Sequence, residues 1–334
     1  MKKSIMLAIL AALFYAINTP LSKLLLTTVP PTFMASFLYL GAGIGVGIMY
    51  LFHYAAEDRS ERLSKSDLPY TIGMIVLDIA APILMMLGIK HGTASNVSLL
   101  GNFEIVATTL IALLVFKEAV SPKLWLAIGF ITVSSILLTF EGAGSFQFSI
   151  GSLFVILATL CWGLENNCTR KISDKSTYEI VMLKGIFSGL GAFAIACIAG
   201  ERLPGFKYII LAMILGFVAY GLSIFSYVRA QRNLGAAKTS AFYAIAPFAG
   251  SLLAFVIVGE KLSAAYLVAL GLMLIGTVFV IWDTIVKNHK HLHTHTITHT
   301  HDATTHQHVI EHEHWHKHNS DESTHRHRFL ELFI

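Results

Sequence analysis

The sequence predicts an all-α integral membrane protein, with ten transmembrane helices arranged as two inverted five-helix repeats and a disordered histidine-rich C-terminal tail. Three observations carry this prediction. Only 13% of the 334 residues are charged and 55% are hydrophobic, whereas a soluble domain is about 25% charged. Apolar stretches that can cross a bilayer, which takes about twenty residues, recur ten times. The second half of the chain also repeats a pattern of the first.

The ten apolar stretches follow one another through short connections. The first begins directly after Met1-Lys2-Lys3. Its length, together with Asn18 and Pro20 within it, favours a retained span over a cleaved signal peptide. We expect spans at 5–26, 31–52, 69–89, 94–116, 123–140, 150–169, 178–199, 208–228, 239–258 and 264–282.

The internal repeat appears when the two halves are aligned. An offset of about 142 residues places Glu260 on Glu118, and an offset of 147 places Glu165 on Asn18. Each repeat holds five spans, an odd number, so the second copy enters the membrane in the opposite orientation. Inverted repeats are a transporter architecture, with the substrate site near the midplane at the repeat interface. We assign the first repeat to 1–141, the second to 142–286 and the tail to 287–334.

The loops carry an asymmetric positive charge. With the N-terminus inside, fifteen Lys and Arg residues lie on the inner side and five on the outer side. This bias predicts a multi-pass protein of the cell membrane with both termini in the cytoplasm. The net charge of +4 is then a topology signal, and it does not indicate nucleic-acid binding. The outer five are Lys23, Lys90, Arg202, Lys207 and Lys261.

Small residues in the second and seventh spans predict close helix packing. Gly43 and Gly47 form a Gly-x-x-x-Gly pair, and Gly185 and Gly189 form another. This spacing puts small residues on one helix face, where two helices can approach each other. We therefore assign these glycines a structural role.

Ionisable residues inside the spans are the main candidates for function, because each costs roughly 2.5–3.5 kcal/mol on insertion scales. A polar cavity that binds a solute or carries protons would use them. A lysine–carboxylate pair or an amide network that only holds helices together is the alternative. Glu104 is the strongest candidate, and for Lys184 a pair with Glu165 is favoured over binding of a substrate carboxylate. The candidate cavity residues are Asn18, Asp78, Asn102, Glu104, Glu165, Lys184 and Tyr243.

Several short motifs resemble EamA-type members of the drug/metabolite transporter superfamily. They are an aromatic-small pair in spans one and six (Tyr15-Ala16 and Trp162-Gly163), Ala246-Pro247 in span nine, and Gly259-Glu260 before the last span. The resemblance covers residues 1 to about 286. It implies ten helices and movement of small solutes, often export coupled to protons or by exchange.

The same resemblance implies structural roles for two residues. Glu118 and Glu260 match the family's glutamate, which we expect to cap the free N–H groups of a neighbouring helix. From the residues themselves we expect Pro247, like Pro20 and Pro82, to unwind or kink its helix where a cavity satisfies the freed backbone. The first repeat departs from the pattern, with Lys117-Glu118 in place of Gly-Glu and Glu104-Ile105 in place of Ala246-Pro247. This departure suggests that the first repeat carries extra polar chemistry.

After Lys287 the composition changes, and fourteen of the sixteen histidines follow, mostly in His-x-His steps. Such low complexity predicts disorder. Neutral imidazole is a good ligand for zinc, nickel, cobalt and copper, so we expect the tail to bind a divalent transition metal, whereas the membrane part requires no cofactor. The expected ligands are His289, His291, His293, His295, His299, His301, His306, His308, His312, His314, His316, His318, His325 and His327.

Together these features predict a secondary transporter whose partners are the lipid bilayer and a small solute. A divalent metal ion and an ordinary small metabolite both remain open as that solute, and a homodimer is left open as an assembly. The alternative is a membrane-anchored metal-binding or metal-sensing protein without transport activity. An enzyme is not expected, because the sequence has no Ser–His–Asp set and no phosphate-binding loop.

Overall fold

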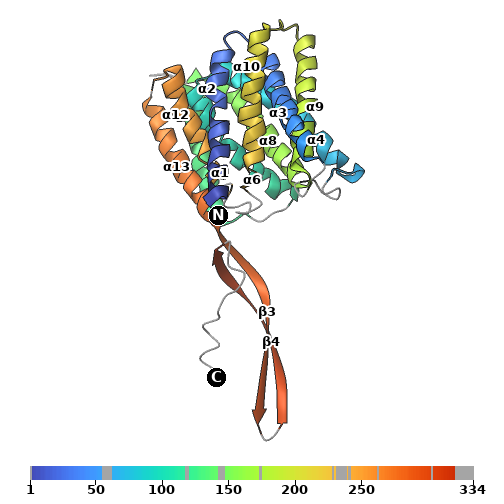
Figure 1. The fold of residues 1–334 in the computed structure, drawn as a ribbon. Helices are drawn as coiled ribbons and strands as arrows, with labels where there is room; N and C mark the ends of the chain where they lie inside the picture. The colour runs from blue at the N-terminus through green and yellow to red at the C-terminus, as the bar shows by residue number, and fades with distance from the viewer. Residues whose placement is uncertain are drawn as a thin grey trace.

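The computed structural model of the chain is a bundle of helices from which a long hairpin projects (Figure 1). It describes residues 2–54, 62–116, 120–141, 147–172, 175–227, 229–230, 239, 242–261, 263–301 and 304–319. The N-terminus and the start of the hairpin lie at the same end of the bundle (Figure 1). We call this end the tail side and the other end the opposite side.

The first five spans comprise seven α-helices, because two of the spans are each broken once. Span one is split at Ile17 and span four at Gly101-Asn102. A short 3-10 helix, Lys65–Asp67, precedes span three. The α-helices are α1 (Lys2–Ala16), α2 (Asn18–Leu25), α3 (Pro31–His53), α4 (Leu68–His91), α5 (Ala94–Leu100), α6 (Phe103–Phe116) and α7 (Pro122–Thr139).

The second five spans follow the same order. Span eight changes from α-helix to π-helix at Phe217–Leu222 (η3). The α-helices of these five spans are α8 (Ile150–Arg170), α9 (Thr177–Ile198), α10 (Phe206–Gly216), α12 (Ala246–Val258) and α13 (Ala264–Ile285). In the described residues nine stretches are long and apolar enough to cross a membrane, and Ala246–Val258 is a shorter apolar helix. The prediction of ten spans is confirmed.

Helix packing follows the inverted repeat. α3 packs on α9 and α7 packs on α13, which pairs span two with seven and span five with ten. α4 packs on α8, a contact between spans three and six. Its counterpart under exchange of the repeats joins spans eight and one, and η3 does contact α1. The two halves therefore interlock along their whole length.

Strands are minor in the helical body and dominate the tail. Phe140–Glu141 (β1) pairs with Gln147–Phe148 (β2) between α7 and α8. In the tail, Val286–His301 (β3) and Thr304–Asn319 (β4) pair as an antiparallel hairpin, where the sequence predicts disorder. Alternating His and Thr residues suit an extended backbone because β-branched residues favour strands. A lone two-stranded hairpin is at best marginally stable in water, so this pairing adds no second core.

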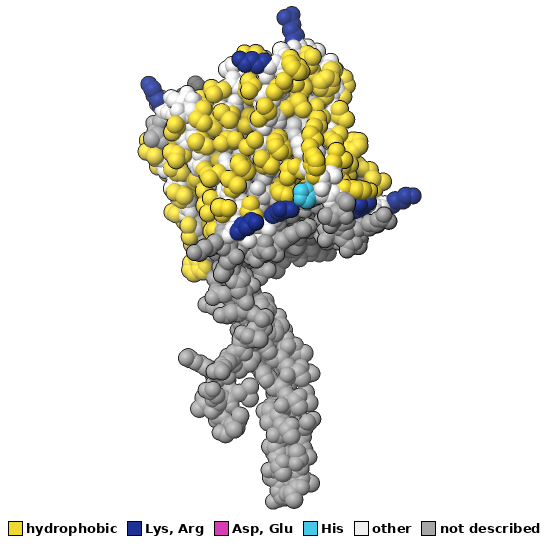
Figure 2. All heavy atoms as spheres, in the orientation of Figure 1, with side chains coloured by type: hydrophobic (Ala, Val, Ile, Leu, Met, Phe, Trp, Pro, Cys, Tyr) yellow, Lys and Arg dark blue, Asp and Glu magenta, His cyan; other side chains and the backbone are white. Residues whose placement is uncertain are grey.

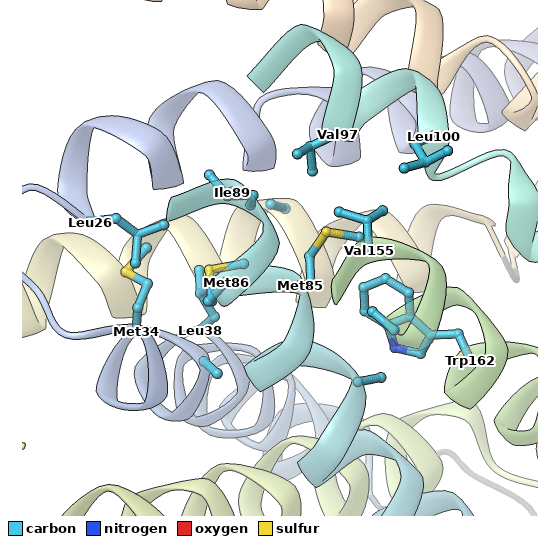
Figure 3. Close-up of a cluster of buried hydrophobic side chains, with 14 of the residues drawn as sticks. Leu26, Met34, Leu38, Met85, Met86, Ile89, Val97, Leu100, Val155 and Trp162 are labelled. Atoms are coloured by element: carbon cyan, nitrogen blue, oxygen red, sulfur yellow. The ribbon is translucent and has the colours of Figure 1, made fainter. Parts of the chain in front are cut away.

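Buried apolar side chains concentrate on the opposite side. The main cluster runs from Leu26 and Met34 through Met86 to Trp162 (Figure 3). On the tail side a second cluster contains only Met74, Ile172 and Ile180 as buried members. Among the described residues, the larger buried apolar cluster therefore lies on the opposite side.

Large apolar side chains also cover the outside of the bundle. Phe52 is 83% exposed, Leu114 77% and Ile198 86%. Figure 2 shows this apolar surface as a continuous face, with Lys and Arg side chains at its two edges. In water so much exposed apolar area would promote aggregation, whereas lipid chains solvate it. The chain is a multi-pass membrane protein.

Glycines allow a close helix contact between α3 and α9. A Cβ on Gly185 would lie 2.4 Å from both the Cα and the N of Gly43. The predicted packing role of Gly43 thus has a direct partner. Gly47 is less constrained, because its Cβ would first meet the flexible Met182 side chain at 3.3 Å.

Gly185→Ala should destabilise the protein by about 1–3 kcal/mol, the usual cost of overpacking a core, because the new methyl group meets backbone. The control is Gly129→Ala, where a Cβ has nothing within 4 Å. Thermal unfolding of the purified protein in detergent measures both. Equal melting temperatures for the two variants would contradict a tight α3–α9 contact.

Candidate functional site

Asp78 lies at the centre of the bundle, on α4, and is completely buried. Its Oδ1 accepts hydrogen bonds from the Tyr39 hydroxyl at 3.0 Å and from Trp162 Nε1 at 3.2 Å. Its Oδ2 lies 2.9 Å from Lys184 Nζ. Three helices, α3, α8 and α9, thus supply donors to one carboxylate. Trp162 is also a member of the apolar cluster of Figure 3, so the site borders that cluster.

Lys184, on α9, pairs with two carboxylates at once. Its Nζ lies 2.9 Å from Asp78 Oδ2 and 3.0 Å from Glu165 Oε1. Glu165 is 2% exposed and also accepts a hydrogen bond from Thr169 on its own helix. Asp78 belongs to the first repeat, and Glu165 and Lys184 belong to the second. The structure therefore contains the expected Lys184–Glu165 pair and adds Asp78 to it.

Glu104 lies just beyond the break between α5 and α6. Its Oε1 accepts a hydrogen bond of 2.6 Å from Asn166 Nδ2, next to Glu165 on α8. Asn102, two residues before Glu104, is 3% exposed, and its Nδ2 has no hydrogen-bond partner among the described residues. The break itself recurs in the second repeat, as a turn at Ala244-Ile245 before α12.

Asn18 begins α2 after the break at Ile17. Its Nδ2 donates to the Tyr220 hydroxyl at 3.0 Å, and its Oδ1 accepts from Ser22 at 3.1 Å. Tyr243 lies at the same level, with its hydroxyl 3.4 Å from Ser223 Oγ. Asn18 therefore joins the first repeat to η3 in the second.

Aromatic rings connect these polar groups. The Tyr15 ring lies 5.8 Å from the Tyr220 ring and 6.0 Å from the Tyr243 ring, and the Tyr39 ring lies 5.3 Å from that of Tyr220. Of the seven predicted cavity residues, Asp78, Lys184 and Glu165 form one ion-paired group. The other four do not join it directly: Asn18 bonds Tyr220, Glu104 bonds Asn166, Tyr243 lies within hydrogen-bond distance of Ser223, and Asn102 Nδ2 has no partner among the described residues.

Prolines free backbone carbonyls close to this site. Pro82 lies inside α4, and because proline has no N–H, the Asp78 carbonyl lacks its helical donor. Pro20 does the same to the carbonyl of Ala16, and Pro247 to that of Tyr243. Pro247 occupies the first turn of α12, so the helix begins there. The sequence predicts a break within the helix at this residue, and the structure places it at the helix start, where proline is tolerated.

Glu260 makes the contact expected of the family's glutamate. Its two carboxylate oxygens accept from the backbone N–H groups of Ala94 at 2.5 Å and Ser95 at 2.8 Å. These are free amides at the first turn of α5. Glu118, its counterpart, lies outside the described residues. Glu201 caps α3 in the same way, through the N–H groups of Thr32 and Phe33, and was not among the predicted residues.

Tyr39 is the main site residue that sequence reasoning misses. A tyrosine in an apolar span is indistinguishable from a packing residue until its partner is known. The one available signal is indirect, since a buried carboxylate such as Asp78 requires hydrogen-bond donors. That requirement does not say which span supplies them.

The described side chains contain no group of three or more His, Cys, Asp or Glu residues that could hold a metal ion. Twelve of the tail histidines, from His289 to His318, belong to β3 or β4, and their side chains lie outside the described part. His325 and His327 lie outside the described residues altogether. The metal-binding role of the tail stays a prediction.

Apolar helices in two interlocked halves, with a buried ion-pair cluster between them, define the class of multi-pass membrane transporters. Comparison with known proteins gives the family. The sequence profile of the EamA-like transporter family matches residues 2–140 and 149–282. The chain belongs to the EamA-like transporter family.

Relatives and a solved structure resemble the chain over most of its length. An uncharacterized transporter of Methanothermobacter thermautotrophicus is 25% identical over 308 residues, covering 82% of this chain and 85% of that protein. An uncharacterized transporter of Clostridium kluyveri is 23% identical over 295 residues, covering 83% and 93%. A crystal structure superposes with a TM-score of 0.61 at 17% identity, covering 83% of this chain and 94% of that one. The latter likeness shows the fold.

Glu260→Ala should lower the stability by about 1–2 kcal/mol, the cost of losing a helix cap, because two amides of α5 lose their acceptor. The control is Lys261→Ala at the neighbouring exposed position. Hydrogen exchange of the α5 amides, read with the melting temperature, checks the effect. Unchanged exchange at Ala94 and Ser95 would mean that Glu260 is not their cap.

Proposed function

We propose that this chain is a secondary transporter of the cell membrane that moves a small solute through the Asp78–Lys184–Glu165 site. The observation that carries the proposal is the pairing of Lys184 with a carboxylate from each repeat. Buried charges are costly in a membrane and face a bundle interior or a water-filled path, where they mark sites of transport.

Polar links between the repeats support movement of one half against the other. Asp78 bonds Trp162 and pairs with Lys184, Glu104 bonds Asn166, and Asn18 bonds Tyr220. Each link joins a residue of the first repeat to one of the second. Such contacts can break and re-form when the halves rock about a central site, as alternating access requires.

The distribution of packing supports the same mechanism. Met85, Met86 and Ile89, which follow Asp78 along α4 toward the opposite side, belong to the apolar cluster of Figure 3. Among the described residues, the buried apolar cluster on the tail side is small. The Lys184 side chain is 14% exposed. A conformation closed on one side and looser on the other is what one state of an alternating-access cycle requires.

For the solute, a small metabolite is better supported than a bare divalent metal ion. A metal ion moving through the bundle would need several oxygen, nitrogen or sulfur ligands in place of its water. The described side chains contain no group of three or more His, Cys, Asp or Glu residues that could hold such an ion.

For the topology, the excess of Lys and Arg in the loops on one side of the membrane supports a cytoplasmic location of both termini.

For the tail, we propose that its histidines bind Zn²⁺, Ni²⁺, Co²⁺ or Cu²⁺ in the cytoplasm, as a buffer or regulator. Support comes from the fourteen histidines of this segment. The strand register also places His291 opposite His314 and His293 opposite His312. Directly opposite residues of an antiparallel pair have Cβ atoms about 4.5–5.5 Å apart, which suits two ligands of one ion.

Asp78→Asn tests the transport proposal. The amide oxygen still accepts from Tyr39 and Trp162, but the charge that pairs with Lys184 is lost. In proteoliposomes screened with labelled amino acids and with Zn²⁺, any solute that the wild type carries should move about tenfold more slowly or worse, the effect of losing about 1.4 kcal/mol in the transport barrier.

Asp67→Asn is the matched control, because it removes one carboxylate from the 3-10 helix before α4, at the tail side. Melting temperatures show whether both variants are folded. Wild-type rates in a folded Asp78→Asn protein would refute a transport role for the cluster.

Deletion of residues 287–334 should abolish tight binding of transition metals while leaving the helical body folded, because the tail histidines are then gone. Isothermal titration with Zn²⁺ and Ni²⁺, before and after deletion, measures this, and circular dichroism checks the helices. A truncated protein that still bound several ions tightly would place the metal sites in the bundle.

A further inference from the structure

Glu104 differs from Asp78 and Glu165 in having no counter-ion among the described side chains. Lys184 pairs with Asp78 and Glu165. No Lys, Arg or His among the described side chains pairs with Glu104, and its one hydrogen bond comes from the neutral amide of Asn166, to Oε1. Its second oxygen, Oε2, has no partner in the described part of the chain. A carboxylate in this state favours binding a cation.

The charge count at the site points the same way. Glu104 joins the charged cluster through Asn166, which donates to Glu104 and is the residue next to Glu165 on α8. With all groups ionised, the carboxylates of Asp78, Glu104 and Glu165 exceed the single ammonium group of Lys184. A net negative charge in a low-dielectric site attracts cations and repels anions.

A cluster of tyrosine rings reaches the same charged site. The Tyr39 hydroxyl donates to Asp78 at 3.0 Å, and the Tyr39 ring lies 5.3 Å from that of Tyr220. The Tyr15 ring lies 5.8 Å from the Tyr220 ring and 6.0 Å from the Tyr243 ring. Aromatic faces attract organic cations through their quadrupole, and quaternary ammonium groups are recognised in this way.

Glu104 and two of the tyrosines are more exposed than the two carboxylates that pair with Lys184. Glu104, Tyr15 and Tyr243 are partly exposed, whereas Asp78 and Glu165 are buried and hold donors on at least one oxygen. A ligand that enters the bundle therefore meets the unpaired carboxylate and the tyrosines without first displacing Lys184.

We propose that the solute is a small organic cation whose ammonium group pairs with Glu104 and lies against the rings of Tyr15, Tyr220 and Tyr243. This inference rests on the proposed transport function and names the class of its solute. A cluster of rings suits an alkylated ammonium group, whereas the described side chains contain no group of three or more His, Cys, Asp or Glu residues that could hold a bare metal ion.

Binding to the full-length protein in lipid nanodiscs tests the proposal. The probes are tetramethylammonium and propylammonium chloride, with sodium chloride at the same ionic strength, the neutral 1-butanol, and sodium acetate as comparisons. Isothermal titration gives the affinities. At least one ammonium probe should bind, and 1-butanol, sodium ion and acetate should not compete with it.

The key variant is Glu104→Gln, which keeps an acceptor for Asn166 but removes the charge. The affinity for the ammonium probe should fall by about tenfold or more, since hydrogen bonds to charged groups contribute about 1.5–3 kcal/mol. Asp67→Asn removes a charge of the same sign from the 3-10 helix before α4 and should leave binding of the ammonium probe unchanged. Tyr243→Leu should weaken binding by about threefold to tenfold, and Tyr243→Phe, which keeps the ring, should not.

Three results would overturn the proposal. In the first, folded Glu104→Gln protein binds the ammonium probe as tightly as the wild type does. In the second, 1-butanol binds as tightly as the ammonium probe. In the third, acetate competes with the ammonium probe. Failure of the transport proposal has a different signature. Ammonium binding that depends on Glu104 but without flux of any solute would refute transport alone, and flux that depends on Asp78 without ammonium binding would refute the cation class alone.

Discussion

The burial of Lys184 between Asp78 and Glu165 is the constraint on which the rest of the bundle depends. Moving two or three ions out of water costs several kcal/mol each, and only good geometry with extra hydrogen bonds offsets that cost. Tyr39 and Trp162 supply those bonds to Asp78. Helices α3, α4, α8 and α9 must therefore meet at one level, and the glycine contact between α3 and α9 allows them to approach closely enough.

The same constraint governs the backbone. A helix that breaks inside a membrane exposes N–H and C=O groups, and these are tolerated only where protein or a water-lined path satisfies them. The breaks at Ile17, at Gly101-Asn102 and at Ala244-Ile245 occur in spans that contact one another. A Cβ on Gly250 in α12 would lie 3.0 Å from the Ala16 carbonyl oxygen and 3.1 Å from Ser98 Oγ. The three irregular segments are thus gathered in one place.

The fold follows from the sequence more completely than the site does. Hydropathy fixes where spans lie because every span must be long and apolar, and the odd number of spans per repeat fixes the inversion. The Lys184–Glu165 pair could also be anticipated, since a buried ammonium group requires a carboxylate. The choice of Asp78 as a second partner could not, because it depends on how the two repeats pack across one another. The structure of the tail could not be predicted from the sequence, since a period-two pattern without a hydrophobic core allows both a hairpin and disorder.

The difference between the repeats separates architecture from chemistry. The break in span four recurs in span nine, so a feature shared by both copies belongs to the frame of the bundle. Glu104 follows the break in the first copy, and at the equivalent place the second copy has Ala246. A carboxylate present in one copy only, and without a counter-ion there, cannot be required by the repeat itself. Lys184 offsets the charges that hold the halves together, and Glu104 is the charge that the architecture leaves available.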